Sequence, residues 1–291
     1  MTRRGVRAVL AAAIGALAVA GAAVYEVGRI HGAGSTAAAP AGETSTRTRE
    51  FWDLYGRAGT ERTAGHLDAA ARLYRQALVL RPEHEDSLYY LGSCLREGGS
   101  YDEAMQIYRQ LIERNPKGSS RSYMQLAAIR ASLEPGAPVD LAEADTLYTR
   151  ALQIDPDSGA LLGLAEVALL QHRLTDAERL LQSVDVDNPI SVAAPYLRGY
   201  LAFERGEAGT AWTHFSTAVA RGGVQKGGVK WTEEGDLKAS PELRWRALAR
   251  QSVFGASWLR LRAYLPPPGP TRADMRSEYR RLHDEVIRRW H

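Results

Sequence analysis

Residues 86–117 read DSLYYLGSCLREGGSYDEAMQIYRQLIERNPK, and this stretch decides the fold. Its first half spaces small and apolar residues three or four positions apart, on one stripe of a helix: Leu88, Leu91, Gly92 and Leu95. Gly98-Gly99 interrupts the pattern, and a second stripe then runs up to Asn115-Pro116: Tyr101, Ala104, Tyr108 and Leu111. The stretch predicts two short helices packed face to face, with Gly92 and Ala104 small where the helices cross.

The second half of this stretch recurs along the chain with one internal spacing. Each copy has an alanine at the same place: Ala70, Ala104, Ala144, Ala177 and Ala211. Four residues further on stands an aromatic residue or Leu: Tyr74, Tyr108, Tyr148, Leu181 and Phe215. Twelve residues after the alanine stands a proline or, in the last copy, a glycine: Pro82, Pro116, Pro156, Pro189 and Gly223. A generic amphipathic helical protein would not keep this register, so the spacing indicates a repeat.

The order Leu-x2-Leu-Gly-x2-Leu, then Ala-x3-Tyr, then Pro resembles the tetratricopeptide repeat. The resemblance implies an all-α fold, a right-handed superhelical solenoid of about five helix pairs over residues 50–222. In the third pair the insertion Glu134–Asp140 lengthens the turn between the helices. The first pair, around Gly56 and Gly59, is irregular, as expected of a terminal repeat with no neighbour on one face.

Two further helices are predicted in residues 240–291, after a Gly-rich loop at 223–239. The first starts at Ser240 and carries an apolar stripe: Leu243, Ala247, Phe254, Trp258 and Leu261. The second starts at a capping box formed by Thr271 and Asp274, and its stripe comprises Met275, Tyr279, Leu282 and Val286. We expect both helices to cap the open end of the solenoid, because its last apolar face must be covered.

The N-terminus predicts a membrane anchor or a cleaved signal. Three arginines (Arg3, Arg4 and Arg7) precede eighteen uncharged residues, Ala8 to Tyr25, so residues 1–27 form the expected apolar helix. Arginines before the helix favour a cytoplasmic N-terminus and an exported body. Residues 28–49 are rich in Gly, Ala, Ser and Thr and are predicted to be a flexible linker.

Catalytic and metal-binding motifs are missing from the sequence. The seven histidines are scattered, no nucleophile elbow or metalloprotease motif occurs, and the Gly222–Lys230 loop lacks the Gly-Lys-Ser/Thr of a phosphate cradle. The only cysteine, Cys94, excludes an intrachain disulfide and is expected to be a buried, inert thiol. We therefore expect a non-enzymatic protein with no cofactor, no metal and no small-molecule substrate.

The family resemblance implies that positions 2, 5, 9 and 12 of each repeat face a concave groove that binds a protein or peptide partner. These groove candidates are Tyr55, Asp86, Tyr89, Ser93, Arg96, Leu162, Glu166, Tyr196 and Tyr200. Tyrosines suit peptide recognition, although Tyr196 and Tyr200 could equally pack under the C-terminal helices. Ser93 stands where a carboxylate clamp would need Asn, so that kind of clamp is not supported.

The C-terminal region offers a second candidate surface. The last 52 residues hold 11 Arg against 5 Asp and Glu, whereas the net charge of the whole chain is only +3. A basic docking face would comprise Arg276, Arg280, Arg281, Arg288 and Arg289, although most charge-rich helix faces are simply solvated.

The expected function is that of a protein-interaction scaffold or assembly factor on the extracytoplasmic side of a bacterial membrane, with no nucleic-acid partner. Two alternatives stay open. One is a cytosolic adaptor that binds an acidic partner or nucleic acid through the basic helices, and the other is an accessory subunit of an enzyme complex.

Overall fold

The computed structural model describes residues 41–156, 158–224, 249, 252–285 and 287–290 of the chain. The apolar helix predicted within residues 1–27 lies outside the described residues, as do residues 225–239 of the predicted Gly-rich loop. Within the described ranges, no helix combines the length and the apolar character that a membrane crossing requires.

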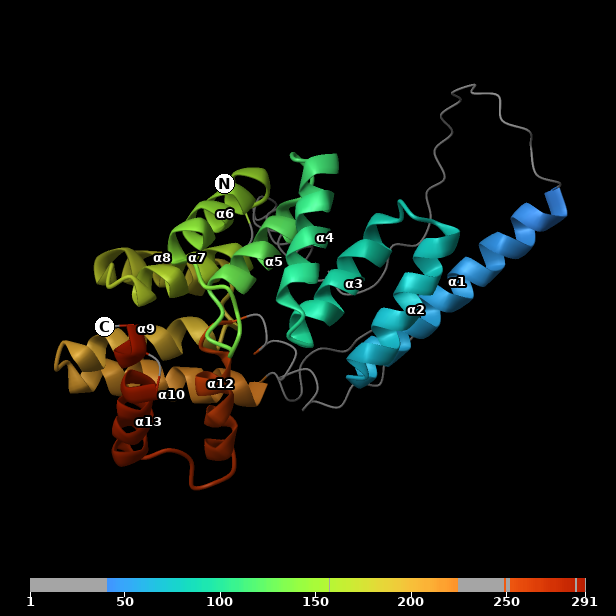
Figure 1. Cartoon of the computed structure of the whole chain (residues 1–291). Helices are drawn as coiled ribbons and strands as arrows, with labels where there is room; N and C mark the ends of the chain where they lie inside the picture. The colour runs from blue at the N-terminus through green and yellow to red at the C-terminus, as the bar shows by residue number, and fades with distance from the viewer. Residues whose placement is uncertain (1–40, 157, 225–248, 250–251, 286, 291) are drawn as a thin grey trace, which may run out of the picture.

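Ten helices form five consecutive pairs, and each helix packs chiefly against its neighbours in the chain (Figure 1). The pairs are α1(Ala41–Ala64) with α2(Leu67–Leu80), α3(Glu85–Glu97) with α4(Tyr101–Arg114), α5(Ser120–Arg130) with α6(Leu141–Ile154), α7(Ser158–Leu170) with α8(Leu174–Asp187), and α9(Ala193–Glu204) with α10(Ala208–Val224). No strand occurs in the part of the chain that the structure describes. The prediction of an all-helical solenoid of about five pairs is confirmed.

The repeated residues form the core of this stack. All five repeat alanines are fully buried, and the aromatic or Leu residues that follow them are buried as well. Gly92 of α3 faces the ring of Tyr108 on α4, and a Cβ at that position would approach the Tyr108 Cζ to 2.9 Å. The glycine of the motif is therefore required by close helix packing.

Helix α1 starts earlier than the sequence suggested. Residues 41–49, predicted as the end of a flexible linker, belong to this helix. Arg81, which follows α2, donates a hydrogen bond from Nη2 to Thr48 Oγ1 at 3.3 Å, and its guanidinium lies 4.7 Å from the Phe51 ring. Contacts with α2 thus extend the first helix beyond what its local composition favours.

The insertion in the third pair lies, as predicted, between α5 and α6. Its last residue, Asp140, caps α6 by accepting hydrogen bonds from the N–H groups of Ala142 and Glu143 at 3.1 and 2.9 Å. Arg130 Nη1 donates to the carbonyl of Pro138 at 2.9 Å. These bonds fix the longer turn without disturbing the pairing of the two helices.

The C-terminal region consists of α12(Gly255–Leu259), η1(Arg260–Tyr264), α13(Arg272–Glu285) and η2(Ile287–Trp290). The predicted capping box is present, because the Thr271 N–H donates to Asp274 Oδ2 at 2.8 Å and the Asp274 N–H donates to Thr271 Oγ1 at 3.2 Å. Helix α13 packs against α9 and α10 (Figure 1). It therefore covers the end of the stack.

The first of the two predicted capping helices is not continuous. A turn at residues 252–254 precedes α12, and Gly255 packs directly against the backbone of Ala249. The apolar stripe nevertheless reaches the core, since Phe254, Trp258 and Leu261 are all buried. The helix is interrupted at this turn because Ser252 and Val253 form hydrogen bonds with Glu166 of helix α7.

Candidate partner-binding face

The first helices of the five pairs (α1, α3, α5, α7 and α9) carry all the groove candidates. We call the surface formed by their positions 2, 5, 9 and 12 the first-helix face. The structure divides this face into two parts. The chain's own C-terminal residues cover the part on α7 and α9, whereas the part on α1, α3 and α5 carries half-buried and exposed side chains.

Glu166 on α7 is fully buried beneath the turn at residues 252–254. Its carboxylate accepts hydrogen bonds from the Ser252 hydroxyl and, at 2.8 Å, from the Val253 N–H. Trp258 Nε1 donates to the Ser252 hydroxyl at 3.0 Å, which ties α12 into the same cluster. Burial raises the pKa of Glu166 to about 7, although the hydrogen bonds from Ser252 and Val253 oppose the shift.

The tyrosines of α9 are also covered. Tyr196 and Tyr200 are 0 and 2% exposed, and their rings pack against Tyr279 of α13 with centroids 5.5 and 6.1 Å away. Tyr279 donates a hydrogen bond to the Tyr196 carbonyl at 3.2 Å, and the Tyr200 hydroxyl lies 3.0 Å from His283 Nδ1. The prediction that Glu166 is free to bind a partner is therefore wrong for this structure. For Tyr196 and Tyr200 the alternative holds, since both pack under the C-terminal helix α13.

Leu162 on α7 packs against the same C-terminal core. Leu162 is therefore partly buried by this contact and belongs to the covered part of the face.

The part on α1, α3 and α5 presents a row of tyrosines. Tyr55, Tyr89 and Tyr90 are half-buried, with ring centroids 6.4 Å apart between Tyr55 and Tyr90 and 5.4 Å apart between Tyr89 and Tyr90. Gln125 Nε2 of α5 donates to the Tyr89 hydroxyl at 3.1 Å and links α5 to α3. The tyrosine row thus spans α1 and α3, and the Gln125 side chain continues the surface onto α5.

The remaining α3 candidates differ in their exposure. Asp86 and Arg96 are half-buried, but Ser93 is buried among the packing residues. Ser93 is therefore a packing position, and Asp86 and Arg96 stay candidates for partner contact.

Two arginines that the sequence analysis missed lie on the tyrosine row. The Arg62 guanidinium of α1 lies 4.6 Å from the centre of the Tyr90 ring, and that of Arg121 on α5 lies 4.0 Å from the centre of the Tyr89 ring. Arg62 occupies position 12 of the first repeat, whose alignment the sequence left ambiguous. Aligning Pro82 with Pro116, which closes the second repeat, places Arg62 at the position that Arg96 occupies there.

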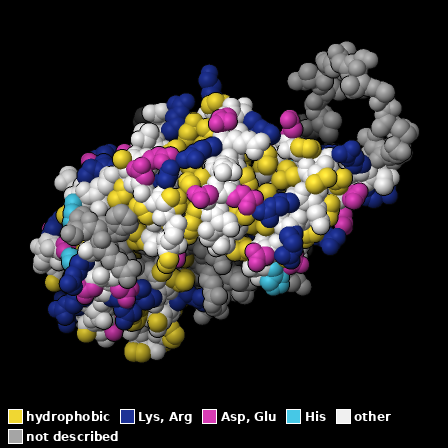
Figure 2. All heavy atoms as spheres, in the orientation of Figure 1, with side chains coloured by type: hydrophobic (Ala, Val, Ile, Leu, Met, Phe, Trp, Pro, Cys, Tyr) yellow, Lys and Arg dark blue, Asp and Glu magenta, His cyan; other side chains and the backbone are white. Residues whose placement is uncertain are grey.

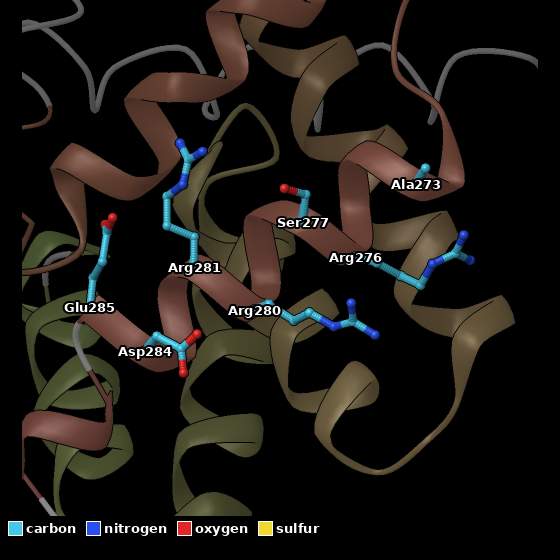
Figure 3. A pocket seen from close by; sticks show the side chains of 7 residues that line it. All are labelled: Ala273, Arg276, Ser277, Arg280, Arg281, Asp284 and Glu285. Atoms are coloured by element: carbon cyan, nitrogen blue, oxygen red, sulfur yellow. The ribbon is translucent and has the colours of Figure 1, made fainter.

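The surface of α13 that was predicted to be a basic docking face is mixed in charge. Figure 2 shows Lys and Arg side chains close to Asp and Glu side chains over this end of the molecule. Arg276, Arg280 and Arg281 line an open depression of about 590 Å³ together with Asp284 and Glu285 (Figure 3). Arg281 pairs with Glu278 at 3.7 Å and Arg288 with Asp284 at 3.7 Å, whereas the side chain of Arg289 lies outside the described part.

The described residues contain no cluster of three or more His, Cys, Asp or Glu side chains that could hold a metal ion. Cys94 is buried, and burial raises the pKa of its thiol to about 11. The expectation of a buried thiol is confirmed, and such a thiol is a poor nucleophile at neutral pH.

Comparison with protein families gives two matches, both described as tetratricopeptide repeat, at residues 55–119 and 139–194. They fall on the helix pairs described above and support the tetratricopeptide repeat family for this chain. No curated protein matches the sequence.

Two solved structures share the fold. The chain is similar to PilF of Pseudomonas aeruginosa, with 15% identity, a TM-score of 0.53 and coverage of 82% of this chain and 99% of that one. It is also similar to PilW, described as a type IV pilus biogenesis factor, with 16% identity, a TM-score of 0.52 and coverage of 82 and 94%. At this identity the likeness shows the fold alone.

Proposed function

We propose that this chain is a non-enzymatic interaction scaffold that binds a segment of a partner protein on the first-helix face of α1, α3 and α5. The observation that carries the proposal is the tyrosine row, because its rings lie side by side on α1 and α3, remain partly exposed, and are joined to α5 by the hydrogen bond from Gln125. Tyrosine supplies rigid contact area together with a polar hydroxyl, which suits recognition of a peptide or helix. Tetratricopeptide repeat proteins are protein-interaction scaffolds, and no enzyme-family match accompanies the two repeat matches.

The restriction to the first three pairs follows from the C-terminal cover. A partner segment cannot use Glu166, Tyr196 or Tyr200 while the turn at 252–254 and α13 lie on them. The site is therefore about two repeats shorter than the stack.

The location of the scaffold is also a proposal. The arginine-flanked apolar stretch Ala8–Tyr25 supports a body held at the extracytoplasmic side of a bacterial membrane. Protease treatment of spheroplasts tests this directly. Digestion of the body supports export, and its protection in intact spheroplasts would contradict it.

Site-specific photo-crosslinking tests the binding face. A benzophenone amino acid replaces Tyr89 on the first-helix face, Arg280 on α13, or Arg72 on the outer side of α2 as the control. All three sites lie on helices and are at least partly exposed. We expect discrete crosslinked proteins from the Tyr89 site and none from the Arg72 site. Equal products from both sites, or none from the Tyr89 site, would refute the proposal.

A second candidate is an adaptor that docks an acidic partner on α13. Arg276 and Arg280 favour it, because both are exposed on adjacent turns and neither forms an ion pair with a described carboxylate. Crosslinks only from the Arg280 site would select this alternative.

A further inference from the structure

Many arginines of the described stack are paired with carboxylates. Such pairs join neighbouring elements throughout the described stack: Arg75 with Glu103, Arg130 with Glu143, Arg173 with Asp145, Arg198 with Glu178, and Arg260 with Glu278. These arginines are committed to holding the fold together.

Arg62 and Arg121 differ from this pattern. Neither forms an ion pair with a carboxylate among the described residues, and both guanidinium groups lie over tyrosine rings instead. Tyr90 lies between them, 4.6 Å from the Arg62 guanidinium and 5.9 Å from that of Arg121. The Nε of Arg62 is buried and has no hydrogen-bond partner. The two cations are thus held in place without a neutralising charge.

A guanidinium group carries five N–H donors in one plane. Arg62 uses part of this set on the Tyr74 side chain, and Arg121 uses part on Tyr89 and Tyr90, which leaves other N–H edges for a ligand. Those edges match the two oxygens of a carboxylate, and the resulting charge-assisted pair is stronger than a neutral hydrogen bond. The arrangement therefore fits a negatively charged ligand better than a neutral one.

We propose that Arg62 and Arg121 recognise acidic side chains of a peptide segment that crosses α1, α3 and α5. This inference rests on the proposed function and adds the class of its partner. Tyr55 and Tyr89 supply the apolar contact between the two charged positions.

Asp86 on the same face limits the ligand sequence. An acidic ligand residue beside Asp86 would meet a like charge, which is unfavourable at short range. The preferred segment therefore carries separated Asp or Glu residues with apolar or aromatic residues between them, and not an uninterrupted acidic run.

A peptide array tests the inference with the full-length chain in mild detergent. The probes are immobilised short peptides of random sequence, and binding is compared for the wild type, Arg62→Gln/Arg121→Gln, and Tyr89→Ala. The charge-matched control is Arg72→Gln/Arg179→Gln, since both of these arginines are exposed on second helices. Circular dichroism and melting temperature show whether each variant keeps the helical fold.

We expect the peptides bound by the wild type to be enriched in separated Asp and Glu residues. Fluorescence anisotropy with the strongest of these peptides should show about tenfold weaker binding for each guanidinium removed. Added salt should weaken the wild-type complex and affect the double variant less. The control variant should bind as the wild type does.

The outcomes separate the two proposals. Peptides that depend on Tyr89 but show no acidic enrichment would overturn the acidic-ligand inference alone, as would enrichment that survives in Arg62→Gln/Arg121→Gln. An array without bound peptides, or binding unchanged in Tyr89→Ala, would overturn the proposed function as well. Vesicles of phosphatidylserine serve as a second probe, and vesicle binding lost in Arg62→Gln/Arg121→Gln without peptide binding would assign the face to lipid.

Discussion

Replacing Glu166 with Gln should make the protein less sensitive to rising pH. Burial raises the pKa of this carboxyl group from 4.5 to about 7 in the folded chain. Between these two pH values the unfolded chain has released a proton that the folded chain still holds. The free energy of unfolding therefore falls as the pH rises from about 4.5 to about 7, and the full penalty persists above that range.

The size of the effect follows from the same two values. The interval between 4.5 and about 7 corresponds to about 3 kcal/mol of stability. The Gln side chain keeps the required hydrogen bonds, because its carbonyl oxygen can accept from the Val253 N–H and its NH₂ can donate to the Ser252 hydroxyl. That hydroxyl already accepts from Trp258 Nε1 and has a second lone pair for this bond. The advantage of the Glu166→Gln variant over the wild type should therefore grow as the pH rises from about 5 and reach about 3 kcal/mol by about pH 8.

Urea unfolding followed by far-UV circular dichroism at several pH values measures this difference. Glu207→Gln provides the control, because Glu207 is exposed in the turn between α9 and α10. Its pH trend should match that of the wild type. Parallel loss of stability in the wild type and in Glu166→Gln would refute the reasoning, because it would show that another group carries the pH dependence.

Three further changes test other parts of the fold. Gly199→Ala would place a Cβ against the Tyr279 hydroxyl, so thermal melts should show a loss of about 1–3 kcal/mol that Tyr279→Phe partly restores; no rescue would contradict the packing between α9 and α13. Asp140→Ala removes the cap of α6 and should cost about 1 kcal/mol in urea unfolding, and an unchanged midpoint would contradict the role of the insertion in fixing α6. Cys94, with a pKa raised to about 11 by burial, should react with a thiol reagent only after the protein unfolds, and fast labelling of the native protein would contradict its burial.

The sequence predicted the helix pairs because their signals are local and repeated. Alanine, aromatic and proline positions recur at fixed spacing, and each one lies where two neighbouring helices touch. The turn before α12 could not be predicted in this way. Its apolar stripe is consistent with one continuous helix, and the break depends on contacts of Ser252 and Val253 with Glu166, which lies 86 and 87 residues earlier in the chain.

The candidate face shows the same contrast between local and distant information. Tyr89 was found from its place in a well-preserved repeat, whereas Arg62 was missed because the first repeat is irregular. The contact that makes Arg62 a candidate joins α1 to α3, because its guanidinium lies over the ring of Tyr90, and such a contact between helices is not encoded in local spacing.

The C-terminal cover also changes how the face positions of such a repeat should be interpreted. Position 9 is Ser93 in the second repeat, Glu166 in the fourth and Tyr200 in the fifth. Glu166 and Tyr200 are both buried, and each forms a hydrogen bond with the C-terminal region. A buried carboxylate is costly unless hydrogen bonds satisfy it, and Glu166 is satisfied only by the turn at 252–254. Its presence at a face position is therefore better explained by binding within the chain than by binding of a partner. It follows that partner specificity should depend on the first three pairs, where Arg62 and Arg121 lie over tyrosine rings and form no ion pair with a described carboxylate.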